Sequence, residues 1–284
     1  MKRRDFVQTM SAATVGGLLA PHRAPLGTAK KLTRIGLETY AVRHAMAQDP
    51  DRTLAAIRAI GFTDVELLWS FNLFGRTPQQ VADTLKKEGL RAPSAHMSGD
   101  TIFVGWERSL DVANVLGHQY LFVPDFEDWT KKTLDDWREW ADRFNAAGAV
   151  ARKHGVWLGF HNESYHQKPI DGQVPLDVFI SRLDPSVTRL QLDVGNMLIG
   201  GGDPMQYLQK YPDRFWSFHL KDALPDRSKD TRLGTGMFDF KKFLAAVPNL
   251  EQKPAHVEQE TANDADGDLA DARANWQYLN QLEF

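Results

Sequence analysis

The feature that most constrains the fold is a regular alternation of short apolar runs with longer amphipathic stretches, which begins near residue 34 and continues to residue 282. Eight runs of strand length occur, at residues 34–40, 64–68, 91–97, 120–124, 157–161, 189–194, 215–220 and 255–258. Stretches with helical apolar spacing follow them, at 53–60, 78–88, 106–116, 134–154, 175–183, 204–211, 240–247 and 268–282. Eight strands, each followed by a helix, predict a closed parallel barrel, the (β/α)8 or TIM barrel.

Glycines support this alternation because they stand where the helices would end. Gly61, Gly89, Gly117 and Gly155 each fit a left-handed residue that caps a helix. No linker or break in composition divides the chain, so we expect a single domain over residues 30–284. A doubly wound sheet is the alternative, and it is disfavoured because no glycine-rich phosphate loop follows the first strand.

The first 29 residues resemble an export signal. Arg3 and Arg4 stand just before Phe6, and a mildly apolar run follows at residues 10–20. That run is too short for a membrane span, which takes ~20 residues. The sequence therefore predicts a cleaved twin-arginine signal at residues 1–29, a periplasmic or secreted protein, and no membrane attachment after cleavage. A cytoplasmic protein with a basic N-terminus is the alternative.

Charge and cysteine content limit the partners and cofactors. The full chain has a net charge of −3 and its predicted signal is basic, so no nucleic-acid partner is expected. The chain has no cysteine, which excludes disulfides, thiolate zinc sites and cysteine nucleophiles. A metal ion would need oxygen and imidazole ligands, which favours Mn²⁺ or Mg²⁺ and leaves Zn²⁺, Co²⁺ and Fe²⁺ open.

Polar residues gather where the predicted strands end, which is the edge at which barrel enzymes carry their sites. They are Glu66, His96, His161, Asn162, Glu163, Asp193, Asn196, His219, Lys221, Asp222, His256, Glu258 and Glu260. Such groups are costly beside apolar strands unless they are paired or bind a metal, so we interpret them as a functional site. Three have structural alternatives: Glu66 as a buried ion-pair partner, His96 as a core histidine, and His256, for which the structural reading is preferred.

The remaining histidines and the tryptophan-rich segment carry no such signal. His44, His118, His154 and His166 are predicted to be surface or loop residues. Trp129, Trp137 and Trp140 have helical spacing and are predicted to belong to the core.

Five segments, in order, resemble motifs of the xylose isomerase-like barrels, the sugar phosphate isomerase/epimerase family. Residues 191–196 (QLDVGN) resemble its D-x-G-H/N element, 218–222 (FHLKD) its H-x-K-D strand, and 233–240 (LGTGMFDF) its G-x-G-x-x-D-F loop. Residues 157–163 (WLGFHNE) resemble the fifth strand of a subgroup with H-N-H, and 256–260 (HVEQE) the terminal V-E-x-D/E. The resemblance extends over about residues 34–282 and again implies the barrel.

The resemblance implies one divalent metal ion, bound by Glu163, Asp193, His219 and Glu258. The fifth strand departs from the subgroup, because Glu163 replaces its second histidine. His161 and Glu163 alternate onto the same side of the strand, so either fits as the ligand. Glu163 is preferred because related epimerases use a carboxylate there.

The expected chemistry follows from this ligand set. An ion that chelates a hydroxy-ketone stabilises an enediolate, with Glu163 and Glu258 as base and acid and Lys221 at an oxyanion or hydroxyl. Substrate contacts are predicted for Glu66, His96, His161 and Asn196.

The predicted function is a metal-dependent isomerase or epimerase of a keto-sugar or polyol, with Mn²⁺ as the preferred ion. The alternative is a metal-dependent lyase or dehydratase of 3-keto-glycosides or related sugars, because the same enediolate can expel a leaving group. A barrel that only binds carbohydrate is less favoured. A DNA-repair endonuclease is disfavoured because it needs several zinc ions and a basic groove. The sequence leaves open whether the chain forms a homo-oligomer.

Overall fold

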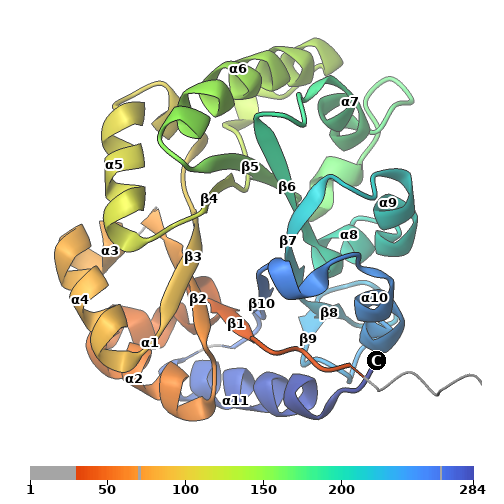
Figure 1. Cartoon of the computed structure of the whole chain (residues 1–284). Coiled ribbons are helices and arrows are strands. Elements are labelled where there is room, and N and C mark those ends of the chain that lie inside the picture. The colour runs from red at the N-terminus through yellow and green to blue at the C-terminus, as the bar shows by residue number, and fades with distance from the viewer. Residues whose placement is uncertain (1–29, 70–71, 263) are drawn as a thin grey trace, which may run out of the picture.

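The computed structural model describes residues 30–69, 72–262 and 264–284; the predicted signal at 1–29 lies outside the described residues. Its centre is a closed barrel of parallel strands with helices around it (Figure 1). The strands are β1 (Gly36–Glu38), β2 (Asp64–Leu68), β3 (Arg91–His96), β4 (Tyr120–Val123), β5 (Trp157–His161), β6 (Thr188–Asp193), β7 (Phe215–Leu220) and β10 (Ala255–Val257). Neighbours around the barrel follow chain order, and β10 pairs with β1 to close it. The predicted (β/α)8 barrel is confirmed.

The helices that cover the barrel match the predicted ones. They are α2 (Pro50–Ile60), α4 (Pro78–Glu88), α5 (Trp106–Leu116), α6 (Leu134–Lys153), α7 (Pro175–Arg182), α9 (Pro204–Lys210), α10 (Phe240–Ala246) and α11 (Ala265–Gln281). Short elements that the apolar pattern did not indicate occupy the loops. They are α1 (Arg43–Gln48), α3 (Asn72–Gly75), α8 (Val194–Ile199), the hairpin of β8 (Asp222–Ala223) and β9 (Asp230–Thr231), and 3-10 turns that include η4 (Asp128–Thr130) and η5 (Ser164–Gln167).

Local sequence explains where the helices begin and end, as α4 illustrates. The Thr77 hydroxyl accepts a hydrogen bond from the backbone N–H of Gln80, and the Gln80 side chain accepts one from the N–H of Thr77. Gly89 ends the helix in the left-handed conformation, which a residue with a Cβ adopts only at a cost of ~1 kcal/mol. A positive φ at Gly61, Gly117 and Gly155 agrees with the other helix ends predicted from glycine.

An aromatic layer packs α6 against the barrel. Phe126 stacks on Trp140 with 4.0 Å between ring centroids, and Trp137 and Trp140 are buried, as predicted. The core prediction is wrong for Trp129, whose side chain is 73% exposed. Trp137 and Trp140 lie three residues apart on one face of α6, whereas Trp129 belongs to the turn η4 that precedes the helix.

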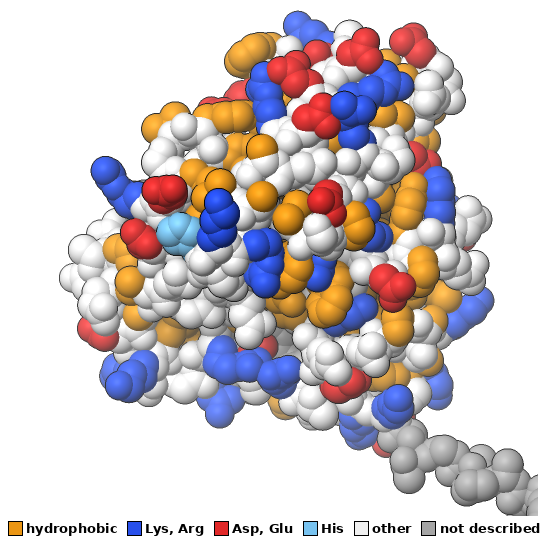
Figure 2. Space-filling model, turned by 45° about the horizontal axis from the view of Figure 1, so that its top comes forward, with side chains coloured by type: hydrophobic (Ala, Val, Ile, Leu, Met, Phe, Trp, Pro, Cys, Tyr) orange, Lys and Arg blue, Asp and Glu red, His pale blue; other side chains and the backbone are white. Residues whose placement is uncertain are grey.

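The outer surface is mixed in character. Side chains of both charges are interspersed with apolar ones over the face that Figure 2 shows. None of the helices in the described part of the chain is long and apolar enough to cross a membrane.

His118, predicted to be a surface or loop residue, lies in the loop between α5 and β4 but is buried there, against β3 and the loop after β2. Its Nδ1–H donates to the carbonyl of Ala92 at 2.6 Å, and its Nε2 accepts from Trp69 Nε1 at 3.3 Å. Both ring nitrogens are therefore satisfied only in the neutral form. Burial lowers the pKa of His118 to about 4.

We expect His118 to make the fold sensitive to acid. An unfolded histidine has a pKa of about 6.5, so the unfolded chain takes up the proton first as the pH falls. The stabilising effect of the neutral ring is complete above pH 6.5 and is lost as the pH approaches about 4. The difference in unfolding free energy between wild type and His118→Gln should then fall by ~1.4 kcal/mol per pH unit in this window. Urea unfolding at several pH values measures it, and a pH-independent difference would contradict the assignment.

Candidate metal centre and active site

The barrel places the predicted site residues at one end because its strands are parallel. Asp193 and His219 are register partners at the ends of β6 and β7, and His161 ends β5. Glu258 follows β10, which pairs with β7. Side chains that lie far apart in the sequence thus meet at the barrel mouth.

Four of these side chains converge closely. One potential ligand atom from each of His161, Asp193, His219 and Glu258 lies within 4.8 Å of the others, and all four residues are buried. Two further groups of possible ligands share His219 with this one. The first is His96, His161 and His219, and the second is Glu66, His219 and His256. The described residues therefore offer one metal centre, built around His219.

The two oxygens of Asp193 have different environments. Oδ1 accepts a hydrogen bond from the backbone N–H of Asn196 at 2.8 Å and so begins α8. Oδ2 is buried and accepts no hydrogen bond. It lies 3.8 Å from His161 Nε2 and 4.0 Å from His219 Nδ1, beyond hydrogen-bond reach. A buried carboxylate oxygen of this kind, facing two imidazole nitrogens, fits a divalent cation.

Glu163, the sequence-based choice of ligand from the fifth strand, lies outside the group of four. It follows β5 and precedes η5. Its Oε2 accepts from Asn196 Nδ2 at 3.0 Å, and its Oε1 lies 3.8 Å from His161 Nε2. Burial, with the nearby carboxylates of Glu258 and Asp193, raises the pKa of Glu163 to about 8 although Lys221 opposes the shift. Glu163 therefore borders the centre, and its carboxyl group holds a proton more readily than an exposed glutamate does.

Lys221 brings a buried positive charge to the same place. Its Nζ lies 3.0 Å from both Asp193 Oδ2 and Glu258 Oε2, and 2.5 Å from Glu260 Oε1. The contact with Asp193 is an ion pair without hydrogen-bond geometry. Burial works against the charge, but these carboxylates raise the pKa of Lys221 well above its usual value.

Burial and neighbouring charges also shift the pKa values of Glu258 and Asp193. Burial would raise the pKa of Glu258, but Lys221 and His219 lower it well below the usual range. Burial raises the pKa of Asp193 to about 7, and Lys221 opposes that shift. The pKa of Glu258 is therefore lowered and that of Glu163 raised at the same end of the barrel.

The glycine of the QLDVGN segment makes room for this lysine. A Cβ on Gly195 would lie 2.5 Å from Lys221 Cγ and 2.8 Å from the Lys221 carbonyl oxygen. Because one of these atoms is backbone, a larger residue would displace β7 or α8. Gly195 thus sets the close approach that brings Lys221 to Asp193.

Asn162 and Asp222 hold the backbone rather than the centre. Asn162 Nδ2 donates to the carbonyl of Asp193 and its Oδ1 accepts from the N–H of Asp193, both at 3.0 Å, which ties β5 to β6. Asp222 accepts the backbone N–H groups of Gly234, Gly236 and Phe238 at 3.0–3.1 Å. A Cβ on Gly236 would lie 2.3 Å from Asp222 Oδ1, which explains the glycine in the GTGMFDF loop.

A layer of polar side chains lies beneath the four converging residues. Glu66 is fully buried, and its carboxylate accepts from Ser94 and from His219 Nε2. Gln191 Nε2 also donates to it, at 2.9 Å to Oε2. With its oxygens occupied from three sides, Glu66 supports His219 from below, whereas the sequence predicted a substrate contact. His96, also predicted to bind substrate, is buried and stacks on His219 with 5.1 Å between ring centroids.

Sequence reasoning missed two residues near Glu163, Asp125 and His166. His166 was predicted to be a surface or loop residue; it lies in the loop after β5, in η5, but it is buried there. Its Nδ1 accepts from the N–H of Glu163 at 3.0 Å, and its Nε2 donates to Asp125 Oδ1 at 3.1 Å. The loops after β4 and β5 are thereby linked, which holds the backbone of Glu163. No spacing rule indicated this contact, because the two residues are 41 positions apart.

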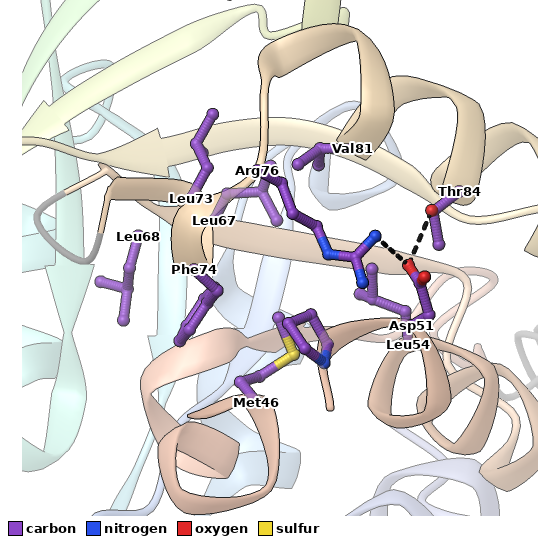
Figure 3. A pocket seen from close by; sticks show the side chains of 11 residues that line it. Met46, Asp51, Leu54, Leu67, Leu68, Leu73, Phe74, Arg76, Val81 and Thr84 are labelled. Atoms are coloured by element: carbon purple, nitrogen blue, oxygen red, sulfur yellow. Dashed lines mark hydrogen bonds and ion pairs between the residues drawn. The ribbon is translucent and has the colours of Figure 1, made fainter. Parts of the chain in front are cut away.

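A separate pocket lies between α1, α2, α3 and α4, and Figure 3 shows its lining. Most of the lining is apolar and includes Met46 from α1, Leu54 from α2 and Leu67 from β2. Arg76 pairs with Asp51 at 2.8 Å at its edge. It lacks a convergence of titratable groups among its described residues, so we assign it to packing.

Comparison with known proteins identifies the family of this chain. The chain belongs to the xylose isomerase-like TIM barrel family, whose model matches residues 54–281. The chain is 29% identical over 144 residues to the inosose dehydratase of Salmonella agona (strain SL483), a match that covers 44% of this chain. That match covers 45% of the relative, less than half its length.

Solved structures show the same fold. A sugar phosphate isomerase/epimerase from Parabacteroides distasonis ATCC 8503 superposes with a TM-score of 0.76 at 22% identity, covering 91% of this chain and 99% of that one. The IOLI protein, solved with a bound zinc atom, superposes with a TM-score of 0.69 at 12% identity, covering 88% and 99%. At these identities the likeness concerns the fold.

Proposed function

We propose that the chain is a divalent-metal-dependent isomerase or epimerase that moves a proton at the carbon beside the carbonyl of a keto-sugar or keto-polyol. His161, Asp193, His219 and Glu258 would hold the ion. This set takes His161 from β5 in place of Glu163, because a ligand atom of His161 lies within the 4.8 Å group and Glu163 lies beside it. When bound, a divalent ion supplies Lewis-acid stabilisation of the enediolate charge.

The observation that carries the proposal is that two carboxyl groups with opposite pKa shifts lie at one site: Glu258 belongs to the group of four, and Glu163 Oε1 lies 3.8 Å from His161 Nε2. Glu258 is ionised, and its Oε2 is contacted by His219 and Lys221, so Oε1 is the atom assigned to take the proton. The pKa of Glu163 is raised to about 8 and its Oε2 accepts from Asn196, so we assign the proton that it would donate to Oε1. Proton abstraction followed by reprotonation requires a base and an acid at one substrate. The pKa directions favour Glu258 as the base and Glu163 as the acid, the reverse of the order expected from sequence.

Lys221 and the lining side chains complete the arrangement. The charged Lys221 would bind the substrate oxygen on which negative charge develops, and the carboxylates that surround it keep it protonated. Asn196, which is hydrogen-bonded to Glu163, would contact a hydroxyl group of the substrate, and the sequence-based substrate contact at His96 stays a prediction. We propose Mn²⁺ as the ion, because half the ligand set is carboxylate, with Zn²⁺, Co²⁺ and Mg²⁺ as comparisons.

The second candidate function is a dehydratase or lyase, and the similarity to a dehydratase favours it. The chain is similar over 144 residues to inosose dehydratase, an enzyme whose name describes the removal of water from an inosose. The same base and acid serve that reaction, with Glu163 protonating the departing hydroxyl. An exported enzyme, as residues 1–29 predict, would meet non-phosphorylated sugars, and a keto-glycoside fits that setting.

Product analysis tests the proposal. The metal-stripped protein is reloaded with Mn²⁺ and incubated with a free ketose, an inosose and a 3-keto-glycoside, and products are identified by NMR. We expect an isomer or epimer to form only with metal, and Glu258→Gln to lower turnover ~10²–10⁴-fold. Loss of water or of the aglycone without an epimer would select the lyase reading. Metal-independent turnover, or unchanged turnover in Glu258→Gln, would overturn the mechanism.

A further inference from the structure

Gln191, in β6, lies beneath the metal centre with every polar atom of its side chain engaged. It is 1% exposed. Its Nε2 donates to both oxygens of Glu66, at 2.9 and 3.1 Å, and to Ser217 Oγ at 3.0 Å. Its Oε1 lies 2.7 Å from His96 Nε2 and 3.0 Å from His161 Nδ1. One amide therefore connects a carboxylate, a hydroxyl and two imidazoles.

The chemistry of these partners fixes the orientation of the amide. An ionised carboxylate only accepts hydrogen bonds, so the NH₂ group of Gln191 must face Glu66. The carbonyl oxygen then faces the two histidines, and it too can only accept. Both facing nitrogens, Nε2 of His96 and Nδ1 of His161, must therefore carry hydrogen.

This decides which nitrogen of His161 is free. With hydrogen on Nδ1, the neutral ring carries its lone pair on Nε2. That atom lies 3.8 Å from Asp193 Oδ2, the oxygen that accepts no hydrogen bond. Gln191 thus turns the lone pair of His161 toward the centre. Glu66 has the matching effect on His219, because it accepts from Nε2 and leaves Nδ1 on the side of Asp193 and Glu258.

We propose that Gln191 is a positioning residue that fixes the Nδ1–H tautomer of His161 and so presents Nε2 as a metal ligand. The inference rests on the proposed function only for the identity of the ligand set. Partners that hold the second nitrogen of a metal-binding histidine typically contribute 10–100-fold to metal affinity. Gln191 acts through His161 and does not itself contact the proposed ion.

The test uses Gln191→Met, which keeps the length of the side chain and removes both amide groups. Ser217→Ala is the matched control. It removes a buried acceptor of the Gln191 NH₂ group and leaves the Gln191 carbonyl oxygen, which faces both imidazoles, in place. Two quantities are measured on the full-length protein. The tautomer of His161 in the metal-free state comes from long-range ¹H–¹⁵N NMR, with the signal assigned by its loss in His161→Gln. The Kd for Mn²⁺ comes from competition with a fluorescent chelator.

We expect wild type and Ser217→Ala to show the Nδ1–H tautomer and Kd values within about threefold of each other, which is small beside the 10–100-fold effect expected of a ligand-orienting residue. In Gln191→Met, the Nε2–H tautomer should appear and the Kd should rise ~10–100-fold. A wild-type His161 with hydrogen on Nε2 would overturn the inference without any variant, so misfolding of Gln191→Met leaves it testable. An unchanged tautomer or Kd in a folded Gln191→Met would also overturn it. If wild type binds no metal ion, the proposed function fails, while the tautomer result still decides the role of Gln191.

Discussion

Metal-stripped wild-type protein should unfold at a distinctly higher temperature when Mn²⁺ is added, and Asp193→Ala should lose this effect. A ligand that binds only the folded state stabilises it by ~2.7 kcal/mol at a hundredfold excess over Kd. For a domain of this size that corresponds to a rise in Tm of roughly 5–10 °C. Asp193 is decisive because it belongs to the group of four possible ligands, and its Oδ2 is buried and accepts no hydrogen bond. Differential scanning calorimetry with and without Mn²⁺ measures the shift.

A control is needed because Asp193 also caps α8. Its removal loses the cap, which contributes ~1 kcal/mol, together with the buried ion pair to Lys221, whatever the metal ion does. Asp203 caps α9 in the same way, accepting from the N–H groups of Met205 and Gln206. Asp203→Ala should therefore lose the same cap contribution and retain the full response to Mn²⁺. A response that persists in Asp193→Ala would remove this residue from the ligand set.

Substitutions at the end of β5 should separate metal binding from proton transfer. His161→Gln should weaken Mn²⁺ binding by more than the ~10–100-fold typical of residues that only orient a ligand. Glu163→Gln should leave the Kd within a few-fold and lower turnover by ~10²–10⁴, because it removes the proposed acid. Kd values from chelator competition and turnover on the active keto-sugar, measured on the same preparations, give both numbers.

The reverse pattern would restore the assignment made from sequence. If Glu163→Gln abolishes Mn²⁺ binding and His161→Gln retains it, Glu163 is the ligand and His161 lines the pocket. Asn196→Ala is a useful companion, since it removes the hydrogen bond to Glu163 Oε2 and leaves His161 untouched. It should affect turnover more than the Kd.

The barrel could be predicted because its signals are local and repeated. Each strand is a short apolar run, and each helix has an apolar face and an end signal such as Thr77 or Gly89. The loops carry weaker signals, so α8 and the β8–β9 hairpin were not predicted. The hairpin depends on a single carboxylate, Asp222, which gathers the N–H groups of residues far along the loop.

The site could be predicted as a set of residues but not as a set of contacts. Parallel strands bring their carboxyl ends together, so Asp193, His219 and Glu258 were placed at one mouth from sequence order alone. Choosing between His161 and Glu163 needed the point where β5 ends, since Glu163 lies beyond the strand in the approach to η5. Alternation along a strand no longer sets the direction of a side chain there.

The supporting residues escaped prediction for a different reason. Gln191 is two positions before Asp193, which puts its side chain on the same inward side of β6 and one layer deeper. A glutamine inside a barrel strand was the available signal. The role of this glutamine depends on its contacts with Glu66, His96 and His161, which lie on three other strands. No spacing rule predicts that these three residues meet.

Deuterium exchange tests the central claim, metal-dependent proton transfer beside a carbonyl, most directly. Metal-stripped and Mn²⁺-loaded protein are each incubated in D₂O with the inosose, the ketose and the keto-glycoside. Proton NMR and mass spectrometry then follow deuterium at the carbon next to the carbonyl. We predict incorporation with the Mn²⁺-loaded wild type, and background levels without metal and in Glu258→Gln. Protein that binds Mn²⁺ but incorporates no deuterium into any of these substrates, and forms no product from them, would contradict the proposed function.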